Sequence, residues 1–143
     1  MEQRVSLITL GVSDLARSRA FYAALGWKEK WSDCEFIAFF QLNGQVLGLY
    51  PLSSLMTDQG KANALPAPGG ITLGINVREK DEVPALCAAF VAAGGTVTSP
   101  PADTPWGSYT AYAADPDGHP WEFTWLPAFP LTEKGELWLP ENM

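Results

Sequence analysis

The chain has 143 residues, of which 47% are hydrophobic and 17% charged, a composition typical of one soluble globular domain. No apolar run approaches the roughly 20 residues of a membrane span, which disfavours a membrane protein. The net charge of −7 and the pI near 4.5 disfavour nucleic acid as a partner, because phosphates require a basic surface.

The start of the chain, Met1-Glu2-Gln3-Arg4, lacks the basic and apolar regions of a signal peptide. Only two cysteines occur, Cys34 and Cys87, and they do not form a CxxC pair. We therefore expect a cytoplasmic protein with two reduced thiols.

The first half of the chain predicts one helix among four strands. Ser13 or Asp14 can accept hydrogen bonds from the first amides of a helix, and Gly26 suits a left-handed helix end. Asn43-Gly44 is typical of a type I′ hairpin turn. The predicted elements are a strand over 4–12, a helix over 15–25, and strands over 27–31, 35–42 and 45–51. Residues 52–69 show no clear periodicity and are predicted to be a linker.

The second half predicts the same order of elements. Pro84 is tolerable in the first turn of a helix, and Gly94-Gly95 ends it. Asp115-Pro116-Asp117-Gly118 is typical of a turn between two strands. The predicted elements are a strand over 70–77, a helix over 81–93, and strands over 96–99, 108–113 and 121–125. Residues 128–143 form a tail beyond the predicted domain, 1–127.

The chain also repeats itself. Ile8-Thr9-Leu10-Gly11-Val12 recurs 63 residues later as Ile71-Thr72-Leu73-Gly74-Ile75. Self-similarity at a fixed offset indicates copies of one supersecondary unit. We therefore predict two β-α-β-β-β units, over about 4–58 and 68–127.

These features together resemble the vicinal oxygen chelate superfamily, which includes glyoxalase I, bleomycin-resistance proteins and extradiol dioxygenases. The resemblance covers residues 4–126. It is carried by the paired units, by Val-Ser-Asp-Leu-Ala-Arg-Ser followed by Phe21-Tyr22 and Leu25-Gly26, by Trp106-Gly107, and by Asp115-Pro116-Asp117-Gly118-His119-Pro120-Trp121-Glu122. It implies an α+β fold in which two paired units form a curled mixed sheet around a concave cavity. It also implies a homodimer.

Metal-dependent relatives usually place a histidine in the first strand of a unit and a carboxylate in the last strand. The corresponding positions here hold Leu7, Gly70 and Gly48, and only Glu122 keeps its ligand type. A catalytic zinc, nickel or iron ion needs about three protein ligands. The only histidine, His119, falls in the predicted turn. We therefore expect no metal and no other cofactor.

Strand alternation predicts which side chains line the cavity. Large aliphatic residues such as Ile8, Leu10 and Val12 should face the helices. The small and polar residues that alternate with them should face the cavity, namely Leu7, Thr9, Gly11, Gly48, Tyr50, Gly70, Thr72, Gly74, Glu122 and Thr124. Glycines there would leave room for an organic ligand, or they would only relieve crowding in a curled sheet.

Glu122 has two interpretations. In a water-poor cavity its ionised form is disfavoured, which suits it to proton transfer or to binding a cationic or hydroxyl group of a ligand. It would then need a hydrogen-bonding neighbour, such as Thr124, Tyr50 or Thr72. Alternatively, it is a relic of an ancestral metal site.

Aromatic side chains are the other candidate ligand contacts. Trp31, Phe36 and Trp106 fall near the expected cavity mouth, where flat rings can stack on a planar ligand. Trp121, Phe123 and Trp125 alternate with Glu122 and Thr124, so they should pack toward the helix layer.

Two functional hypotheses follow. The first is a metal-independent protein of the bleomycin-resistance type, which binds a small organic molecule, aromatic or not, without altering it. The second is an enzyme similar to lactoylglutathione lyase, an isomerase or a dioxygenase, which uses Glu122 as a catalytic residue with or without a metal.

Overall fold

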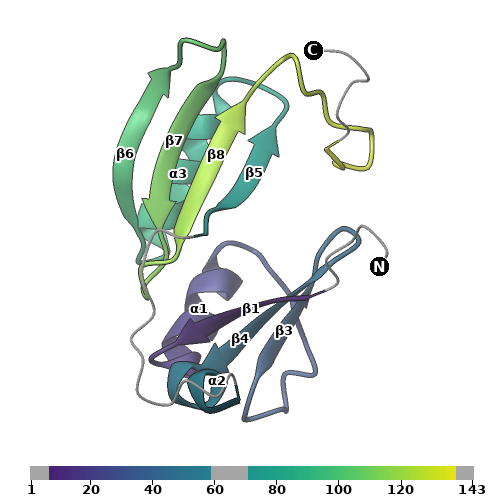
Figure 1. Ribbon diagram of the computed structural model, residues 1–143, viewed down its shortest axis with the longest axis vertical. Helices are drawn as coiled ribbons and strands as arrows, with labels where there is room; N and C mark the ends of the chain where they lie inside the picture. The colour runs from purple at the N-terminus through teal and green to yellow at the C-terminus, as the bar shows by residue number, and fades with distance from the viewer. Residues whose placement is uncertain (1–6, 59–70, 138–143) are drawn as a thin grey trace. The chain divides into compact units, whose positions relative to one another are not determined.

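The computed structural model describes residues 7–58 and 71–137. The chain divides into two compact units, Met1–Ala67 and Pro68–Met143, and each is described by itself. Each unit holds one four-stranded mixed sheet (Figure 1). The predicted α+β fold of two β-α-β-β-β units is confirmed.

Unit 1 has the strand order β1-β4-β3-β2. Strand β1 runs parallel to β4, and the other neighbouring strands are antiparallel. Its elements are β1 (Leu7–Val12), α1 (Leu15–Ala24), β2 (Glu29–Lys30), β3 (Ala38–Gln41), β4 (Val46–Pro51) and α2 (Leu52–Asp58).

Helix α1 has the predicted ends. The side chain of Asp14 accepts a hydrogen bond from the backbone N–H of Arg17, and Gly26 has a φ of +87°. The helix buries Phe21 and Tyr22, and the sheet contributes a matching buried set of Leu10, Val12, Ala38, Phe40, Leu47 and Leu49. The predicted helix-facing side of the first strand is thus confirmed at Leu10 and Val12.

Unit 2 repeats this plan with the strand order β5-β8-β7-β6, in which β5 is parallel to β8. Its elements are β5 (Leu73–Val77), α3 (Glu82–Ala92), β6 (Thr96–Asp103), β7 (Tyr109–Ala114) and β8 (Pro120–Trp125). Helix α3 lies behind the sheet in Figure 1, so the reader looks onto the opposite face.

The core of unit 2 lies between α3 and β8. The ring of Phe90 meets Phe123 edge-on, with centroids 4.8 Å apart, and meets Trp121 in the same way at 5.9 Å. All three side chains are buried. The prediction that Trp121 and Phe123 point toward the helix layer is therefore correct.

Local predictions differ from the structure at several places. Residues 52–58 form helix α2 and not a linker. Strand β6 runs to Asp103, well past Ser99, with two register shifts against β7. The hairpin at Asn43-Gly44 forms, but only Gly44 has a positive φ, so the turn is not type I′.

The described part of the tail folds onto unit 2. Leu131 and Leu137 form an isolated β-bridge, and Thr132 and Glu136 pair through their backbones between them. The guanidinium of Arg78, just after β5, donates hydrogen bonds to the carbonyl oxygens of Leu131, Thr132 and Glu133 at 3.4, 2.6 and 3.2 Å. One arginine thereby attaches the tail to the sheet edge.

Candidate functional site

The face of the unit 2 sheet opposite α3, here called the open face, carries the polar residues of the central strands. Strand register places them in two rows across the sheet. The first row is Gly74, Glu122 and Tyr112, and the second row is Asn76, Thr124 and Thr110. The sequence predicted Glu122 and Thr124 on one face, and the structure agrees.

Glu122 is paired across the strands with Tyr112. The phenolic O–H of Tyr112 donates a 2.9 Å hydrogen bond to Oε1 of Glu122. This hydrogen bond, together with burial and the negative charge of Glu122, raises the pKa of Tyr112 above its ordinary value. On the other side of Glu122, no atom of the described residues lies within 4 Å of the position that a Cβ of Gly74 would occupy. The carboxylate therefore has a donor on one side and open space on the other.

A chain of four hydroxyl groups supports the second row. Thr124 contacts Thr110 at 3.1 Å between their Oγ1 atoms, and Thr110 contacts Ser108 Oγ at 3.0 Å. Ser108 in turn contacts Thr104 Oγ1 at 2.7 Å. Because Ser108, Thr110 and Thr124 are buried, these contacts satisfy groups that water does not reach.

The hydroxyl chain ends in the loop that presents Trp106. Thr104 and Ser108 bracket this loop and are also joined by a 2.8 Å backbone hydrogen bond. The Trp106 side chain between them is 72% exposed. A loop fixed by these hydrogen bonds therefore holds the large exposed ring of Trp106 just before the start of β7.

In unit 1, the equivalent face carries Thr9, Gly48 and Phe39 in one row. A Cβ at Gly48 would lie 3.4 Å from the Phe39 ring and 3.4 Å from Thr9 Oγ1. The ring of Trp31 meets Phe39 edge-on, with centroids 6.1 Å apart. The side chains of Phe39 and Thr9 therefore fill the space beside Gly48 in this row.

The segment that carries Trp31 and Phe36 combines exposed rings with an unusual backbone. Trp31 and Phe36 are 71% and 75% exposed, and Trp31 has a φ of +51°, a strained conformation for a bulky residue. Arg19 of α1 donates hydrogen bonds to the carbonyl oxygens of Cys34 and Ile37 and forms a 3.0 Å ion pair with Glu29. These contacts anchor the segment to α1.

The residues at the family metal positions do not fit a metal centre. Leu7 is a half-exposed hydrocarbon, and Gly48 has the Phe39 ring where a carboxylate side chain would extend. Among the family metal positions, Glu122 alone has a side chain that can coordinate a metal. Its carboxylate already accepts a hydrogen bond from the Tyr112 hydroxyl. Within residues 7–58 and 71–137, no three His, Cys, Asp or Glu side chains gather into a possible metal site.

His119 has the turn role that the sequence assigned to it. Asp115 is buried, and its Oδ1 accepts the backbone N–H groups of Asp117 and His119. Its Oδ2 lies 2.7 Å from Nδ1 of His119. The pair fixes the hairpin that joins β7 to β8 and so sets the register that brings Tyr112 opposite Glu122.

Several predicted site residues lie elsewhere or have other neighbours. The strand predicted from residue 70 begins at Leu73, so exposed Thr72 precedes it, and Gly70 lies outside the described residues. Tyr50 is paired with Gly11 at the end of β1 and β4. The neighbour of Glu122 is Tyr112, rather than Thr124, Tyr50 or Thr72. Counting back from the Asp115–Gly118 turn along an antiparallel pair would have identified Tyr112.

Comparison with known proteins gives the family. A sequence profile of the Glyoxalase/Bleomycin resistance protein/Dioxygenase superfamily matches residues 4–123. The chain belongs to this superfamily. Among proteins of curated function, none matches the sequence.

Solved structures share the fold. A glyoxalase-related enzyme from Fulvimarina pelagi is 37% identical, with a TM-score of 0.88 over 96% of this chain and 99% of that one. A hypothetical protein from S. aureus is 26% identical, with a TM-score of 0.75 over 88% and 95%. A lactoylglutathione lyase from Agrobacterium tumefaciens is 25% identical, with a TM-score of 0.64 over 87% and 95%.

None of the helices in the described part of the chain has the length and apolar character needed to cross a membrane.

Proposed function

We propose that this superfamily member binds a small organic molecule on the open face of unit 2 without a bound metal. One observation carries the proposal: the Glu122 carboxylate accepts the Tyr112 hydroxyl on one side and faces open space over Gly74 on the other. A molecule with a hydrogen-bond donor group suits such a face.

The chemistry of Glu122 specifies the ligand further. An ionised carboxylate offers about four acceptor sites, and one hydrogen bond to Tyr112 leaves most of them available. Across the open face of the described sheet, Glu122 is the one ionisable carboxylate, with Asn76, Thr110 and Thr124 as neutral polar neighbours. We therefore propose a ligand with a cationic or hydroxyl group that donates to Glu122.

The aromatic residues supply the second part of the proposal. Trp106, held just before the start of β7 by the hydroxyl chain, exposes a flat ring that suits stacking on a planar ligand. In unit 1, taken by itself, the exposed rings of Trp31 and Phe36 are proposed as stacking contacts on the same reasoning. Thr9, Gly48 and Tyr50 stay weaker candidates, because neighbouring side chains already occupy the row at Gly48.

A matched pair of planar probes tests the proposal. 9-Aminoacridine is a cation, and 9-anthracenecarboxylate is an anion of similar shape. Equilibrium dialysis should show at least tenfold tighter binding of the cation, and Glu122→Gln should remove that preference. Equal binding of both probes, or none, contradicts the proposal.

Metal analysis tests the part of the proposal that concerns binding without a metal. After growth with added zinc, nickel and iron, followed by dialysis, we expect far less than one metal ion per chain. Stoichiometric metal that disappears in Glu122→Ala would overturn the metal-independent proposal.

A second candidate function is catalysis. The observation that favours it is the likeness, at 37% identity, to a structure described as a glyoxalase-related enzyme. In this function Glu122 takes a proton from a carbon acid, and Tyr112 orients the carboxylate. The test is formation or consumption of lactoylglutathione by the purified protein. Turnover lost in Glu122→Gln would favour the enzyme over the binding protein.

A further inference from the structure

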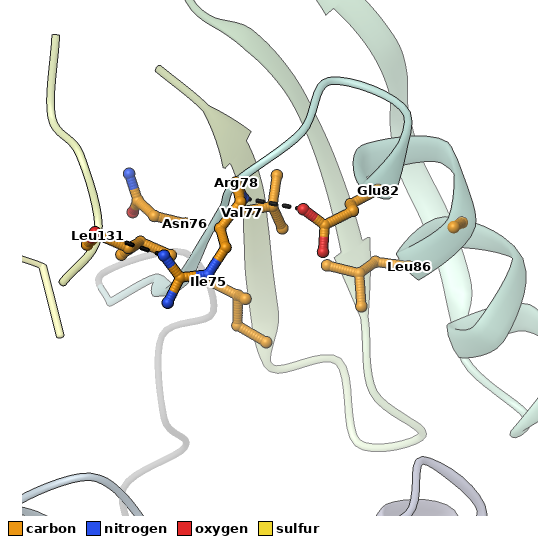
Figure 2. Close-up of a pocket in the computed structure, with 8 residues that line it drawn as sticks. Ile75, Asn76, Val77, Arg78, Glu82, Leu86 and Leu131 are labelled. Atoms are coloured by element: carbon orange, nitrogen blue, oxygen red, sulfur yellow. Dashed lines mark hydrogen bonds between the residues drawn. The ribbon is translucent and has the colours of Figure 1, made fainter. Parts of the chain in front are cut away.

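A separate pocket opens at the free edge of β5, between that strand, α3 and the tail (Figure 2). Its volume is about 360 Å³, at the lower end of the range for ligand sites. It is lined by Ile75, Asn76, Val77, Arg78, Glu82, Ala85, Leu86 and Leu131. Most of these side chains are apolar.

This pocket is distinct from the open face. Successive residues of a strand point to opposite faces of the sheet. In β5, Gly74 and Asn76 belong to the rows of the open face. Ile75 and Val77 therefore point to the α3 side. Leu86 of α3 and Leu131 of the tail complete the apolar wall. A ligand here would not contact Glu122.

Arg78 gives the pocket its charge. Its guanidinium has five N–H donors, and the three contacts to the tail carbonyls leave two N–H groups available. Within the described residues, no carboxylate forms an ion pair with this guanidinium. Figure 2 shows the guanidinium beside Leu131, on the side of the pocket away from Glu82.

Glu82, the other charged group of the pocket, is already occupied. Its Oε2 accepts the backbone N–H groups of Arg78 and Glu79 at 2.8 and 2.7 Å, at the start of α3. These donors and the positive end of the helix offset its charge. Among the described residues, the Arg78 guanidinium therefore has no anionic partner, whereas the Glu82 carboxylate accepts two backbone N–H groups.

We propose that this pocket binds a small apolar carboxylate, with Arg78 contacting the carboxylate and Ile75, Val77, Leu86 and Leu131 enclosing the hydrocarbon chain. Arginine suits this role because its guanidinium stays charged and keeps an N–H donor available for a carboxylate oxygen. The tail contacts hold the guanidinium in place before the ligand arrives, which reduces the entropy lost on binding.

Sodium octanoate is the probe, and 1-octanol is its neutral counterpart. In ¹H–¹⁵N NMR titrations of the full chain, octanoate should shift the resonances of Ile75, Val77 and Leu86 in a saturable manner. Arg78→Met should weaken octanoate binding at least tenfold and leave octanol binding within about twofold. The matched control Arg17→Met, an exposed arginine of α1, should leave both unchanged.

Arg78→Met also removes the tail contacts, so a second variant tests the apolar wall with those contacts intact. Leu86→Asp retains Arg78 and places a carboxylate in the wall, so both probes should lose binding. Equal loss of octanoate and octanol in Arg78→Met, unchanged octanoate binding in that variant, or octanoate shifts confined to the Glu122 face would each overturn the proposal.

Discussion

At the scale of single residues, the Tyr112–Glu122 pair is the most consequential contact on the open face. It joins neighbouring strands through one hydrogen bond of 2.9 Å and gives Glu122 a fixed donor. The register between β7 and β8, set by the Asp115 turn, places the two side chains directly opposite each other. The orientation of Glu122 thus depends on residues outside the site.

The pair makes Tyr112 a titratable reporter. Because the hydrogen bond to Glu122, burial and the charge of Glu122 raise the pKa of Tyr112, Glu122→Gln should lower that pKa toward the ordinary value of about 10. Titration of a ¹³C-labelled tyrosine resonance measures the shift. Glu133→Gln in the tail is the control. An unchanged Tyr112 pKa in Glu122→Gln contradicts the assigned cause.

The same shift fixes the sign of a stability effect. A pKa that is higher in the folded than in the unfolded state means that Tyr112 stabilises the fold below pH about 10 and loses this contribution at higher pH. The difference in unfolding free energy between the native protein and Tyr112→Phe should therefore shrink from pH 8 to pH 12. Urea denaturation across that range measures it.

At the scale of elements, the two copies of the repeated strand have diverged around one glycine. A Cβ at Gly11 would lie 2.6 Å from Cδ1 of Leu52 and 3.2 Å from Cδ2 of Leu55, both in α2. At the equivalent glycine of the second copy, Gly74, a Cβ would have no atom of the described part of the chain within 4 Å. The lack of a side chain at Gly11 therefore leaves room for helix α2. The lack of a side chain at Gly74 leaves open space beside Glu122.

This difference predicts opposite effects of the same substitution. Gly11→Ala should lower the free energy of unfolding by about 1–2 kcal/mol, because Leu52 must move to relieve the clash. Gly74→Ala should leave stability unchanged or raise it by up to about 1 kcal/mol, since it restricts the unfolded chain without a clash. Chemical denaturation of the two variants measures both effects. A larger loss at Gly74 than at Gly11 contradicts this account.

The elements also mark where sequence reasoning was sufficient. The end signals of α1 at Asp14 and Gly26 and the alternation of β8 are local, so the sequence predicted them. Helix α2 was missed because it packs through Leu52 against Gly11 of β1, a contact between distant parts of the sequence that no local pattern predicts. Tyr112 was missed because its role depends on cross-strand register. The pocket at Arg78 depends on the hydrogen bond from Arg78 to Thr132, which lies 54 residues further along the chain.

At the scale of the whole molecule, each unit is small. A domain of roughly 60 residues buries only about 60% of the surface of its unfolded chain and is marginally stable alone. Each unit of this chain, Met1–Ala67 and Pro68–Met143, is near that size. We therefore expect each unit to be only marginally stable when it is expressed alone.

Cooperative unfolding is the measurable consequence. Calorimetry should show one transition whose calorimetric and van 't Hoff enthalpies agree. Phe90→Ala, which removes the central ring of the unit 2 core, should lower the midpoint of that transition and keep it single. A second transition that leaves unit 1 folded would show that the units are independent. The homodimer implied by the family resemblance stays a prediction for sedimentation analysis.

The two edges of the unit 2 sheet are not alike. Strand β6 contains Pro100 and Pro101, and its register shifts between Ser99 and Ala102. Consecutive backbone N–H groups of a strand point to opposite sides, so one proline removes a donor toward β7 and the other removes a donor toward the free side. Strand β5 contains no proline. Templated strand addition to this sheet is therefore disfavoured at β6, and at β5 it would first have to displace the tail that Arg78 holds at that edge.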